Sequence, residues 1–165
     1  MKEEGVFQEA SWIWCNGAPS SRNSYLYARK TFNVPWRIRT AVAYVTADSR
    51  YKLYINGRFM GRGPARCDPR WQSYDEYDVT KCLRPGINVV ATLIHHLGED
   101  TFSYKLGRGG FLFEARVKGE DGEEISVVSD GSWKVKRAEA WNQTSPRLTF
   151  AVGFAELASK QASCT

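Results

Sequence analysis

The dipeptide Asn56-Gly57 separates two short runs of strand-forming side chains, residues 51–55 and 58–61. A two-residue type I′ turn needs positive φ at both central residues, and Asn and Gly adopt that conformation most readily. The sequence therefore predicts a β-hairpin over residues 51–61. The next segment, residues 62–66, reads Arg-Gly-Pro-Ala-Arg, and we expect a stiff, doubly cationic loop that folding alone does not explain.

Other runs of alternating or β-branched side chains occur along most of the chain and predict further strands. Residues 24–32 alternate between apolar and polar side chains, as in a half-buried strand. Residues 40–47 are small and β-branched, which favours a strand buried on both faces. Residues 87–96 form the longest β-branched run, and we expect a central strand there. The shorter predicted strands are residues 74–79, 110–118, 125–129 and 132–136.

Short strands with turn signals about every ten residues are typical of a β-sandwich or β-barrel. No window carries apolar residues at helical spacing over more than about three turns, and only residues 80–86 suggest one helical turn. From residue 138 onward the pattern is irregular, and we expect an extended strap that includes at most one last strand. At 165 residues the chain fits a single all-β domain that buries roughly 70% of the surface of its unfolded form.

The distribution of charge argues against several classes of partner. The net charge is +5, but Lys and Arg are dispersed, whereas nucleic-acid binders usually concentrate them in one stripe. A basic, aromatic β-barrel that binds single-stranded nucleic acid stays as an alternative. No run approaches the roughly 20 apolar residues of a membrane helix. The polar N-terminus shows no signal peptide and the four Cys stand apart, so we expect a cytoplasmic protein with reduced thiols.

Motifs for catalysis and for metal binding are missing from the sequence. There is no Gly-x-Ser-x-Gly nucleophile motif, and neither His stands at metal-ligand spacing from a Cys. Glycoside hydrolysis needs two opposed carboxylates. The acidic groups at residues 75–78, 99–100 and 120–124 instead fall in turns or short edges, where solvated carboxylates are expected. We therefore predict no catalytic residue, no metal site and no cofactor.

The loop around Trp71 is the main candidate for a binding site. Trp71 lies in a polar loop near Arg66 and Asp68, and the cationic segment begins at Arg62. A flat apolar ring beside bidentate donors and acceptors is what recognition of sugar hydroxyls requires. The sequence therefore predicts carbohydrate contacts from these four residues. The same tryptophan would serve equally well to cap a sheet edge.

The pair His95-His96 ends the longest predicted strand. Because side chains alternate along a strand, the two rings should point to opposite faces, and only one of them can reach a given site. A His at a strand end is able to donate a hydrogen bond to a ligand in the neighbouring loops. We include His95 and His96 among the candidate carbohydrate-binding residues, and the structural alternative is one core-facing and one rim-facing ring.

The order of short motifs along the chain is more specific than any one of them. The motifs are Ala10–Trp14, Tyr25–Phe32, Ala47–Gly57, Gly61–Arg66, Tyr77–Thr80, Leu83–Val89, His95–Gly98, Gly109–Leu112 and Ser129–Lys134. Their succession resembles the N-terminal β-sandwich domain of bacterial α-L-rhamnosidases, over about residues 10–155.

This resemblance implies a galactose-binding-like jelly-roll β-sandwich that accompanies a helical-barrel catalytic domain. The acidic catalytic residues of that family belong to the barrel, so the resemblance implies no catalytic residue here. It divides the chain into an N-terminal extension (1–9), the sandwich (10–155) and a C-terminal tail (156–165) that departs from the family's pattern after Gly153-Phe-Ala-Glu156. We expect a non-catalytic accessory domain that supports the catalytic domain and contacts a rhamnose-containing glycan.

Two further expectations concern what the chain does by itself. A stand-alone, lectin-like carbohydrate-binding module is the alternative to an accessory domain. A module without its partner domain should also expose apolar surface. We therefore expect self-association into a homo-oligomer through the Trp12/Trp14 side or through residues 141–154.

Overall fold

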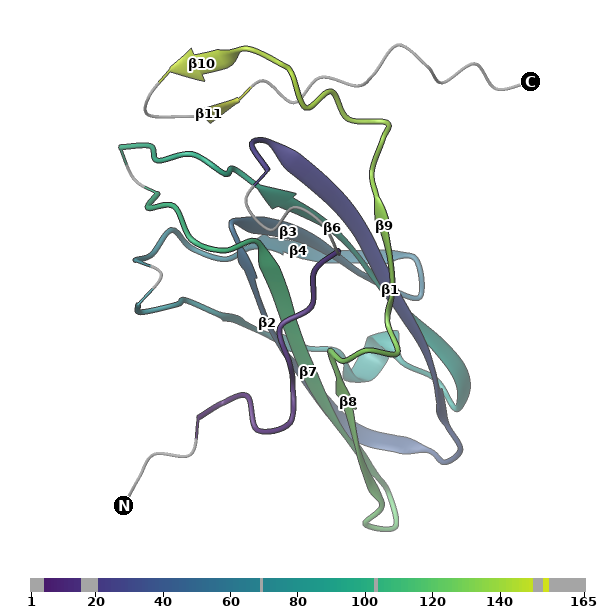
Figure 1. Ribbon diagram of the computed structural model, residues 1–165. Coiled ribbons are helices and arrows are strands. Elements are labelled where there is room, and N and C mark those ends of the chain that lie inside the picture. The colour runs from purple at the N-terminus through teal and green to yellow at the C-terminus, as the bar shows by residue number, and fades with distance from the viewer. Residues whose placement is uncertain (1–4, 16–20, 69, 103, 150–152, 155–165) are drawn as a thin grey trace, which may run out of the picture.

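Two antiparallel sheets pack face to face in the computed structural model of the protein, which describes residues 5–15, 21–68, 70–102, 104–149 and 153–154 (Figure 1). The elements are β1 (Ser24–Val34), β2 (Ile38–Asp48), β3 (Arg50–Ile55), β4 (Arg58–Gly63), β5 (Asp75–Asp78), the single-turn 3-10 helix η1 (Thr80–Cys82), β6 (Gly86–His96), β7 (Gly110–Gly119), β8 (Glu124–Val128), β9 (Lys134–Arg137), β10 (Arg147–Thr149) and β11 (Gly153–Phe154). One sheet has the strand order β4-β3-β6-β1-β9 and the other β5-β2-β7-β8. The predicted all-β sandwich is therefore confirmed.

The hairpin and the central strand also follow the prediction. Asn56 and Gly57 have φ angles of 50° and 81°, as a type I′ turn requires, and they join β3 to β4. The strand β6 lies third of five in its sheet. Within the described residues, no helix is long and apolar enough to cross a membrane.

The core lies between the sheets and is filled by alternate residues of each strand. Its largest fully buried side chains include Tyr51, Leu53, Ile94, Phe111 and Phe113. Burying one such side chain contributes roughly 2 kcal/mol to the free energy of unfolding. The two sheets are thus held together mainly by apolar contact.

The strand β2 is less buried than residues 40–47 suggested. Ala41, Ala43 and Val45 face the core and are at most 1% exposed. On the opposite face Tyr44 is only half-buried, and its ring contacts Tyr74 and the Arg116 guanidinium. The other sheet covers only the inner face of β2. The expectation of burial on both faces was therefore wrong for Thr40, Val42 and Tyr44, whereas Thr46 on the outer face is 1% exposed.

The N-terminal arm, residues 5–15, begins on the outer face of the second sheet, and from Ser11 onward it runs along the edge of β7, where Ile13 forms an antiparallel bridge with Phe111 (Figure 1). Glu114 of β7 anchors it, because Oε2 of this buried carboxylate accepts the backbone N–H groups of Gln8 and Glu9 at 2.9 and 3.1 Å. The other oxygen, Oε1, accepts hydrogen bonds from Nε and Nη2 of Arg116. The same Nη2 group also donates a hydrogen bond to the backbone oxygen of Val6 at 2.8 Å. The arm is therefore a structured part of the domain from at least Val6 onward.

The strand β4 continues to Gly63, two residues beyond the predicted hairpin, and it lies against the edge strand β5 of the other sheet. Tyr51 donates its hydroxyl hydrogen to the Asp75 carboxylate, and its oxygen lies 3.0 Å from the Tyr77 hydroxyl. A Cβ at Gly63 would meet Asp75 Oδ2 at 1.9 Å, and one at Gly61 would meet the Tyr77 hydroxyl at 2.5 Å. Close packing between the sheets therefore explains both glycines.

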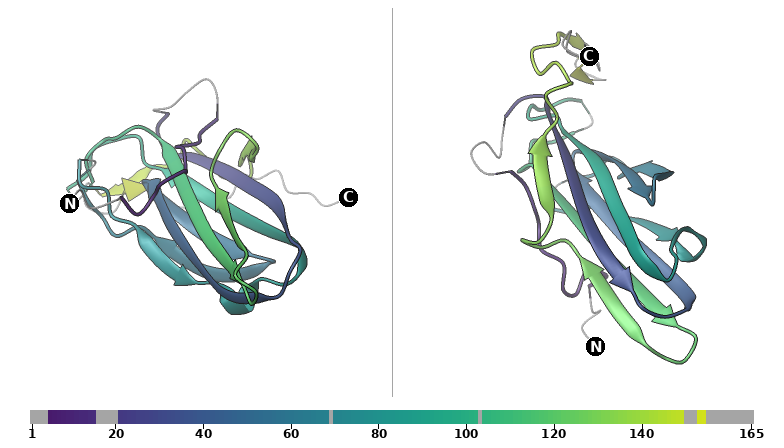
Figure 2. Two further views of the ribbon diagram at one scale, coloured as in Figure 1. Left: turned by 90° about the horizontal axis from the view of Figure 1, so that it is seen from below. Right: turned by 90° about the vertical axis from the view of Figure 1, so that its right-hand side faces the viewer.

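The C-terminal strap lies beyond the end of the sandwich, with β10 and β11 paired to each other (Figure 2). This differs from the single last strand that the sequence suggested. Asn23 connects the strap to the first sheet, because its amide nitrogen donates to Asn142 O at 3.2 Å and to Ser145 Oγ at 2.9 Å. The strap is thus fixed near the start of β1.

Candidate functional site

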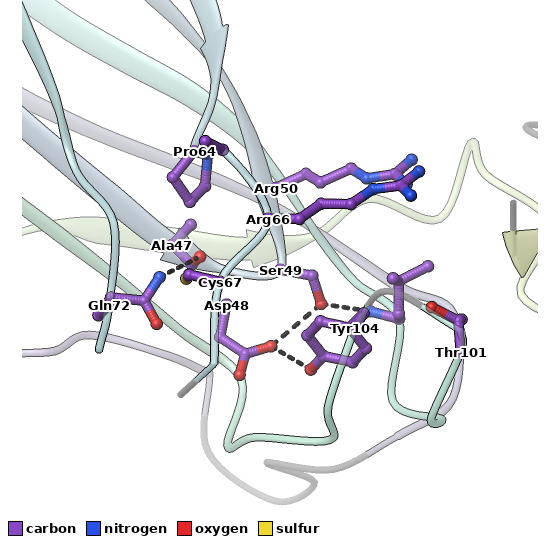
Figure 3. A pocket seen from close by; sticks show the side chains of 12 residues that line it. Ala47, Asp48, Ser49, Arg50, Pro64, Arg66, Cys67, Gln72, Thr101 and Tyr104 are labelled. Atoms are coloured by element: carbon purple, nitrogen blue, oxygen red, sulfur yellow. Dashed lines mark hydrogen bonds between the residues drawn. The ribbon is translucent and has the colours of Figure 1, made fainter. Parts of the chain in front are cut away.

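Two adjoining hollows open at the end of the sandwich where β4 leads into the loop before β5. The larger, which we call the cationic groove, has a volume of about 470 Å³. Its lining residues are Tyr25, Arg50, Tyr51, Lys52, Arg62, Gly63, Pro64, Ala65, Arg66, Leu93 and His95. The smaller, which we call the Asp48 pocket, is lined by Ala47, Asp48, Ser49, Arg50, Pro64, Ala65, Arg66, Cys67, Gln72, Leu97, Thr101 and Tyr104 (Figure 3). The two hollows share Arg50 and residues 64–66.

Strand register builds the floor of the cationic groove from the outer face of the first sheet. Tyr25 pairs with His95, and His95 pairs with Arg50, so these three residues form one row across β1, β6 and β3. The next row two residues along contains Leu93 and Lys52, and Lys52 in turn pairs with Arg62 of β4. Residues two apart on a strand share a face, so both rows point the same way.

All charged side chains in the described lining of the cationic groove are positive. Arg50, Lys52, Arg62 and Arg66 line it, and no Asp or Glu belongs to the described lining. Lys52 and Arg62 stand directly opposite each other on neighbouring strands. Like charges in that relation repel and destabilise the sheet. Arg50 and Arg66 extend in the same direction, away from Asp48 (Figure 3).

An aromatic stack forms one wall beside the groove. The Tyr25 ring lies between His95, with centroids 4.1 Å apart, and Trp141 of the strap, with centroids 5.0 Å apart. The ammonium of Lys52 lies 5.7 Å from the Trp141 ring centroid, within range of a cation–π interaction. The stack therefore connects the sheet, the strap and one of the groove's cations.

His95 in this stack is uncharged at ordinary pH. Burial lowers its pKa to about 3, and the nearby positive charges of Arg50 and Lys52 act in the same direction. Its Nε2 lies 2.8 Å from Asn23 Oδ1. The amide nitrogen of Asn23 donates to the strap, so the amide oxygen faces His95 and must accept a hydrogen from Nε2. His95 is thus a neutral ring whose role at the groove is shape rather than charge.

Asp48 lies at the base of the smaller hollow as a buried, hydrogen-bonded carboxylate. Its Oδ1 accepts hydrogen bonds from Ser49 Oγ at 3.0 Å and from the Tyr104 hydroxyl (Figure 3). The same oxygen lies 3.0 Å from His96 Nδ1. Burial raises the pKa of this carboxyl, but the hydrogen bonds from His96 and Tyr104 outweigh burial and hold the pKa below its usual value. The pocket therefore presents an ionised hydrogen-bond acceptor.

The structure brings together three of the six residues proposed for sugar contacts. Arg62, Arg66 and His95 all line the cationic groove. His96 lies on the opposite face of β6, fully buried beside Asp48 and edge-on to the Trp14 ring. The rings of the two histidines therefore point to opposite faces, as expected for neighbours on a strand.

The other two proposed residues lie in the loop before β5 and line neither hollow. Asp68 forms an ion pair with Arg70 at 2.9 Å, and hydrogen bonds from Arg70 lower the pKa of its carboxyl to about 2. The Trp71 side chain is 80% exposed. Whether any of the six contacts a sugar stays a prediction.

Sequence reasoning did not single out Arg50, Lys52, Tyr25 or Asp48, which complete the two hollows. The available signal was the alternation of Arg50 and Lys52 with core residues on β3. This alternation does not indicate which residue of β4 pairs with Lys52. Among the residues that the structure describes, no group of three or more His, Cys, Asp or Glu could hold a metal ion.

Comparison with known proteins places this chain beside a part of much longer enzymes. The model of the alpha-L-rhamnosidase N-terminal domain family matches residues 36–145. The crystal structure of a GH78 family rhamnosidase of Bacillus sp. GL1 superposes with a TM-score of 0.84 and 38% sequence identity, over 93% of this chain and 16% of that one.

In two curated alpha-L-rhamnosidases, too, the matched region is a small part of the whole protein. The protein of Streptomyces avermitilis is 29% identical over 125 residues, which are 64% of this chain and 11% of that protein. The protein of Alteromonas sp. (strain LOR) is 26% identical over 156 residues, which are 82% of this chain and 17% of that protein. The chain thus spans less than a fifth of the length of either relative.

Proposed function

This chain belongs to the alpha-L-rhamnosidase N-terminal domain family, and on that premise we propose that it is a non-catalytic accessory domain of a larger glycoside hydrolase of the α-L-rhamnosidase type. The matched region is a small part of each relative, which leaves ample length for a separate catalytic domain. The partner in this proposal is that catalytic domain. Among the residues that the structure describes, one carboxylate, that of Asp48, lines the two hollows, whereas glycoside hydrolysis ordinarily uses a pair.

The proposal includes direct contact with carbohydrate at the two hollows. The observation that carries it is their junction at Arg66, which lines both. On one side lies the Asp48 carboxylate, an acceptor for sugar hydroxyls, and on the other lie guanidinium donors and the apolar side chain of Leu93. Convergent polar groups around apolar surface are the usual composition of a small-ligand site. A rhamnose-containing glycan is the expected ligand.

The accessory role is tested with the purified chain and an aryl α-L-rhamnoside. We expect no hydrolysis above the uncatalysed rate. Hydrolysis that a single carboxylate substitution abolishes would overturn the non-catalytic role. The mass of the native protein in its source then separates two arrangements, because a mass several times 18.7 kDa means a domain of an enzyme, whereas 18.7 kDa means a stand-alone, lectin-like module.

The carbohydrate contact is tested by calorimetric titration with rhamnose-containing oligosaccharides. We expect binding that Arg66→Ala weakens by about ten-fold, the loss of roughly 1.4 kcal/mol. Arg58→Ala is the matched control, because Arg58 is also an exposed arginine near this hairpin but lines neither hollow. Flat titrations across a broad glycan panel would remove carbohydrate binding from the proposal.

A further inference from the structure

We infer that a third hollow, built around the Trp12 ring, binds a second sugar unit of the glycan. This inference rests on the proposed carbohydrate contact and deepens it, because it requires a ligand of at least two sugar units. The hollow, which we call the Trp12 hollow, has a volume of about 530 Å³, within the range of roughly 300–1,000 Å³ that holds one small ligand. Arg108 lines it beside Trp12, and it shares Asp48 and Gln72 with the Asp48 pocket. A ligand in the Asp48 pocket therefore has the Trp12 hollow next to it.

The Trp12 side chain is held in place and remains open to solvent. The neighbouring residue Ile13 exchanges two backbone hydrogen bonds with Phe111 of β7, each 3.0 Å long. The indole lies against the start of β7, because a Cβ at Gly110 would come within 2.6 Å of its Cε3 atom. Trp12 is nevertheless 51% exposed, and among the described residues no aromatic ring stacks on it. A flat apolar surface that is already positioned loses little freedom when a ligand binds.

Asp48 has one carboxylate oxygen that is available to a ligand. Ser49, Tyr104 and His96 all contact the other oxygen, Oδ1. Among the residues that the structure describes, none forms a hydrogen bond with Oδ2, which points away from Ser49 and Tyr104 (Figure 3). Because an ionised carboxylate oxygen only accepts hydrogen bonds, Oδ2 is suited to a hydroxyl donor.

Gln72 and Arg108 add a further acceptor and a donor group. The amide nitrogen of Gln72 donates to Thr46 Oγ1 at 3.0 Å, and its amide oxygen has no hydrogen bond within the described part of the chain. Arg108 is exposed, and its guanidinium forms neither a hydrogen bond nor an ion pair with any described residue. Guanidinium donors together with amide and carboxylate acceptors can bind the hydroxyl groups of a sugar.

The lining of the Trp12 hollow favours an uncharged sugar over other ligands that cover an aromatic ring. Asp48 and Arg108 are the charged residues of the described lining, so there is no excess of positive charge that would select an anion. A flat aromatic compound would cover Trp12 but bring few donors to Asp48 and Gln72, and polar groups left unpaired on burial cost free energy. A sugar ring offers an apolar face to the indole and hydroxyl groups to the polar side chains.

The inference is tested by calorimetric titration of the full chain with uncharged probes of two lengths, L-rhamnose and a set of rhamnobioses that differ in linkage. We expect at least one rhamnobiose to bind about ten-fold more tightly than L-rhamnose, which corresponds to roughly 1.4 kcal/mol. The reason is that only the disaccharide reaches the Trp12 ring while it occupies the Asp48 pocket. Equal affinity for every probe would overturn the second sugar site and leave the carbohydrate contact of the proposed function in place.

Variants of the Trp12 hollow provide the second measurement. Trp12→Ala should weaken binding of the preferred rhamnobiose by about ten-fold, to the affinity of L-rhamnose, and leave binding of L-rhamnose nearly unchanged. Trp12→Phe keeps a flat ring and should retain part of the gain. Arg108→Gln removes the guanidinium donors and should weaken binding of rhamnobiose by about five-fold. Because Arg108 is exposed and has no partner among the described residues, its replacement should leave the fold intact.

Phe59→Ala is the matched control for Trp12→Ala, and Arg58→Gln is the control for Arg108→Gln. Phe59 is 53% exposed, close to the value for Trp12, and Arg58 is also exposed. Both residues lie beside the Asn56-Gly57 turn and line none of the three hollows. Neither control should change the affinity for either probe.

Three further outcomes would overturn the inference. A loss in Phe59→Ala as large as in Trp12→Ala overturns the location. Equal weakening of L-rhamnose and rhamnobiose by Trp12→Ala means that the tryptophan supports the Asp48 pocket and forms no second sugar site. A dimer in light scattering that Trp12→Ala dissociates assigns the exposed ring to contact between copies of the chain. If no saccharide binds, this inference and the proposed carbohydrate contact fail together.

Discussion

The imidazole of His95 lies parallel to the phenol ring of Tyr25, with ring centroids 4.1 Å apart and the planes 3° apart. Trp141 stacks on the other face of Tyr25 at 5.0 Å. The stack therefore joins two strands of the first sheet to the strap. The strap is also held by hydrogen bonds from Asn23 and by Arg147, whose Nη2 donates to Asp100 O at 2.8 Å.

Trp141→Ala should loosen the strap while the sandwich stays folded. The substitution removes an aromatic stack worth about 0.5–1.5 kcal/mol beyond its buried area and also the cation–π contact of Lys52. Amide hydrogen exchange should become faster over residues 141–147 and remain unchanged in β6. Trp71→Ala is the control, because the Trp71 side chain is 80% exposed. Equal exchange rates in the strap before and after the change would show that the stack does not hold it.

The lowered pKa of His95 predicts a loss of stability in acid. Between the folded pKa of about 3 and the unfolded value of about 6.5, the unfolded state binds a proton that the folded state does not. The free energy of unfolding contributed by His95 is thus fully present above about pH 6.5 and falls as the pH drops from 6.5 towards 3, by at most about 1.4 kcal/mol per pH unit.

His95→Gln is the variant that isolates this effect, because an amide N–H retains the donor for Asn23 Oδ1 and does not titrate. Denaturant unfolding at about pH 7, 6, 5 and 4 should show a shallower decline in the variant than in the unmodified chain. Asp48 and Glu114 have pKa values below their usual range, and their contribution falls in acid in both proteins. The difference between the two profiles therefore reports His95, and parallel profiles would contradict the assignment.

Glu114→Gln should release the N-terminal arm. Burial raises the pKa of this carboxyl, but hydrogen bonds from the N–H groups of Glu9 and Gln8 and from Arg116 outweigh it, and the net pKa lies below the usual value. Hydrogen bonds to a charged acceptor contribute about 1.5–3 kcal/mol each, so we expect the unfolding free energy to fall by about 2 kcal/mol and exchange at residues 8–10 to accelerate. Glu124→Gln, which breaks only an exposed contact of 3.6 Å with Lys118, should change stability by less than about 0.5 kcal/mol.

The sequence was sufficient to predict the sandwich, because its signals are local. The Asn56-Gly57 turn, the alternation within strands and the long run of β6 each depend on neighbouring residues. The candidate site depends instead on register. The pairing of β3 with β4 shifts between Leu53 and Tyr54, so that Leu53 stands opposite Gly61 and one residue of β4 has no partner.

That shift decides which residues of β4 face the groove. If β3 and β4 paired residue by residue from the turn outward, with no extra residue in β4, Arg62 would stand opposite Tyr51, whose side chain faces the core. With the shift, Arg62 stands opposite Lys52, and Gly63 takes the place opposite Tyr51. A bulge inserts one residue and turns every later side chain to the other face. No residue pattern in this hairpin indicates a bulge. The pairing of Arg62 with Lys52 on the same face of the sheet was therefore not predictable from the sequence.

Gly63→Ala tests this packing most directly. A Cβ at Gly63 would clash with Asp75 Oδ2 and lie 3.0 Å from the Tyr51 hydroxyl, so either the Asp75 side chain must leave its contact with Tyr51 or the edge strand β5 must move away. Either change should lower the unfolding free energy by about 1–3 kcal/mol, the usual cost of overpacking. Gly131→Ala is the matched control, because a Cβ there meets nothing within 4 Å. The two variants are compared by denaturant unfolding, and equal midpoints would mean that the Tyr51–Asp75 contact does not limit the approach of the two sheets.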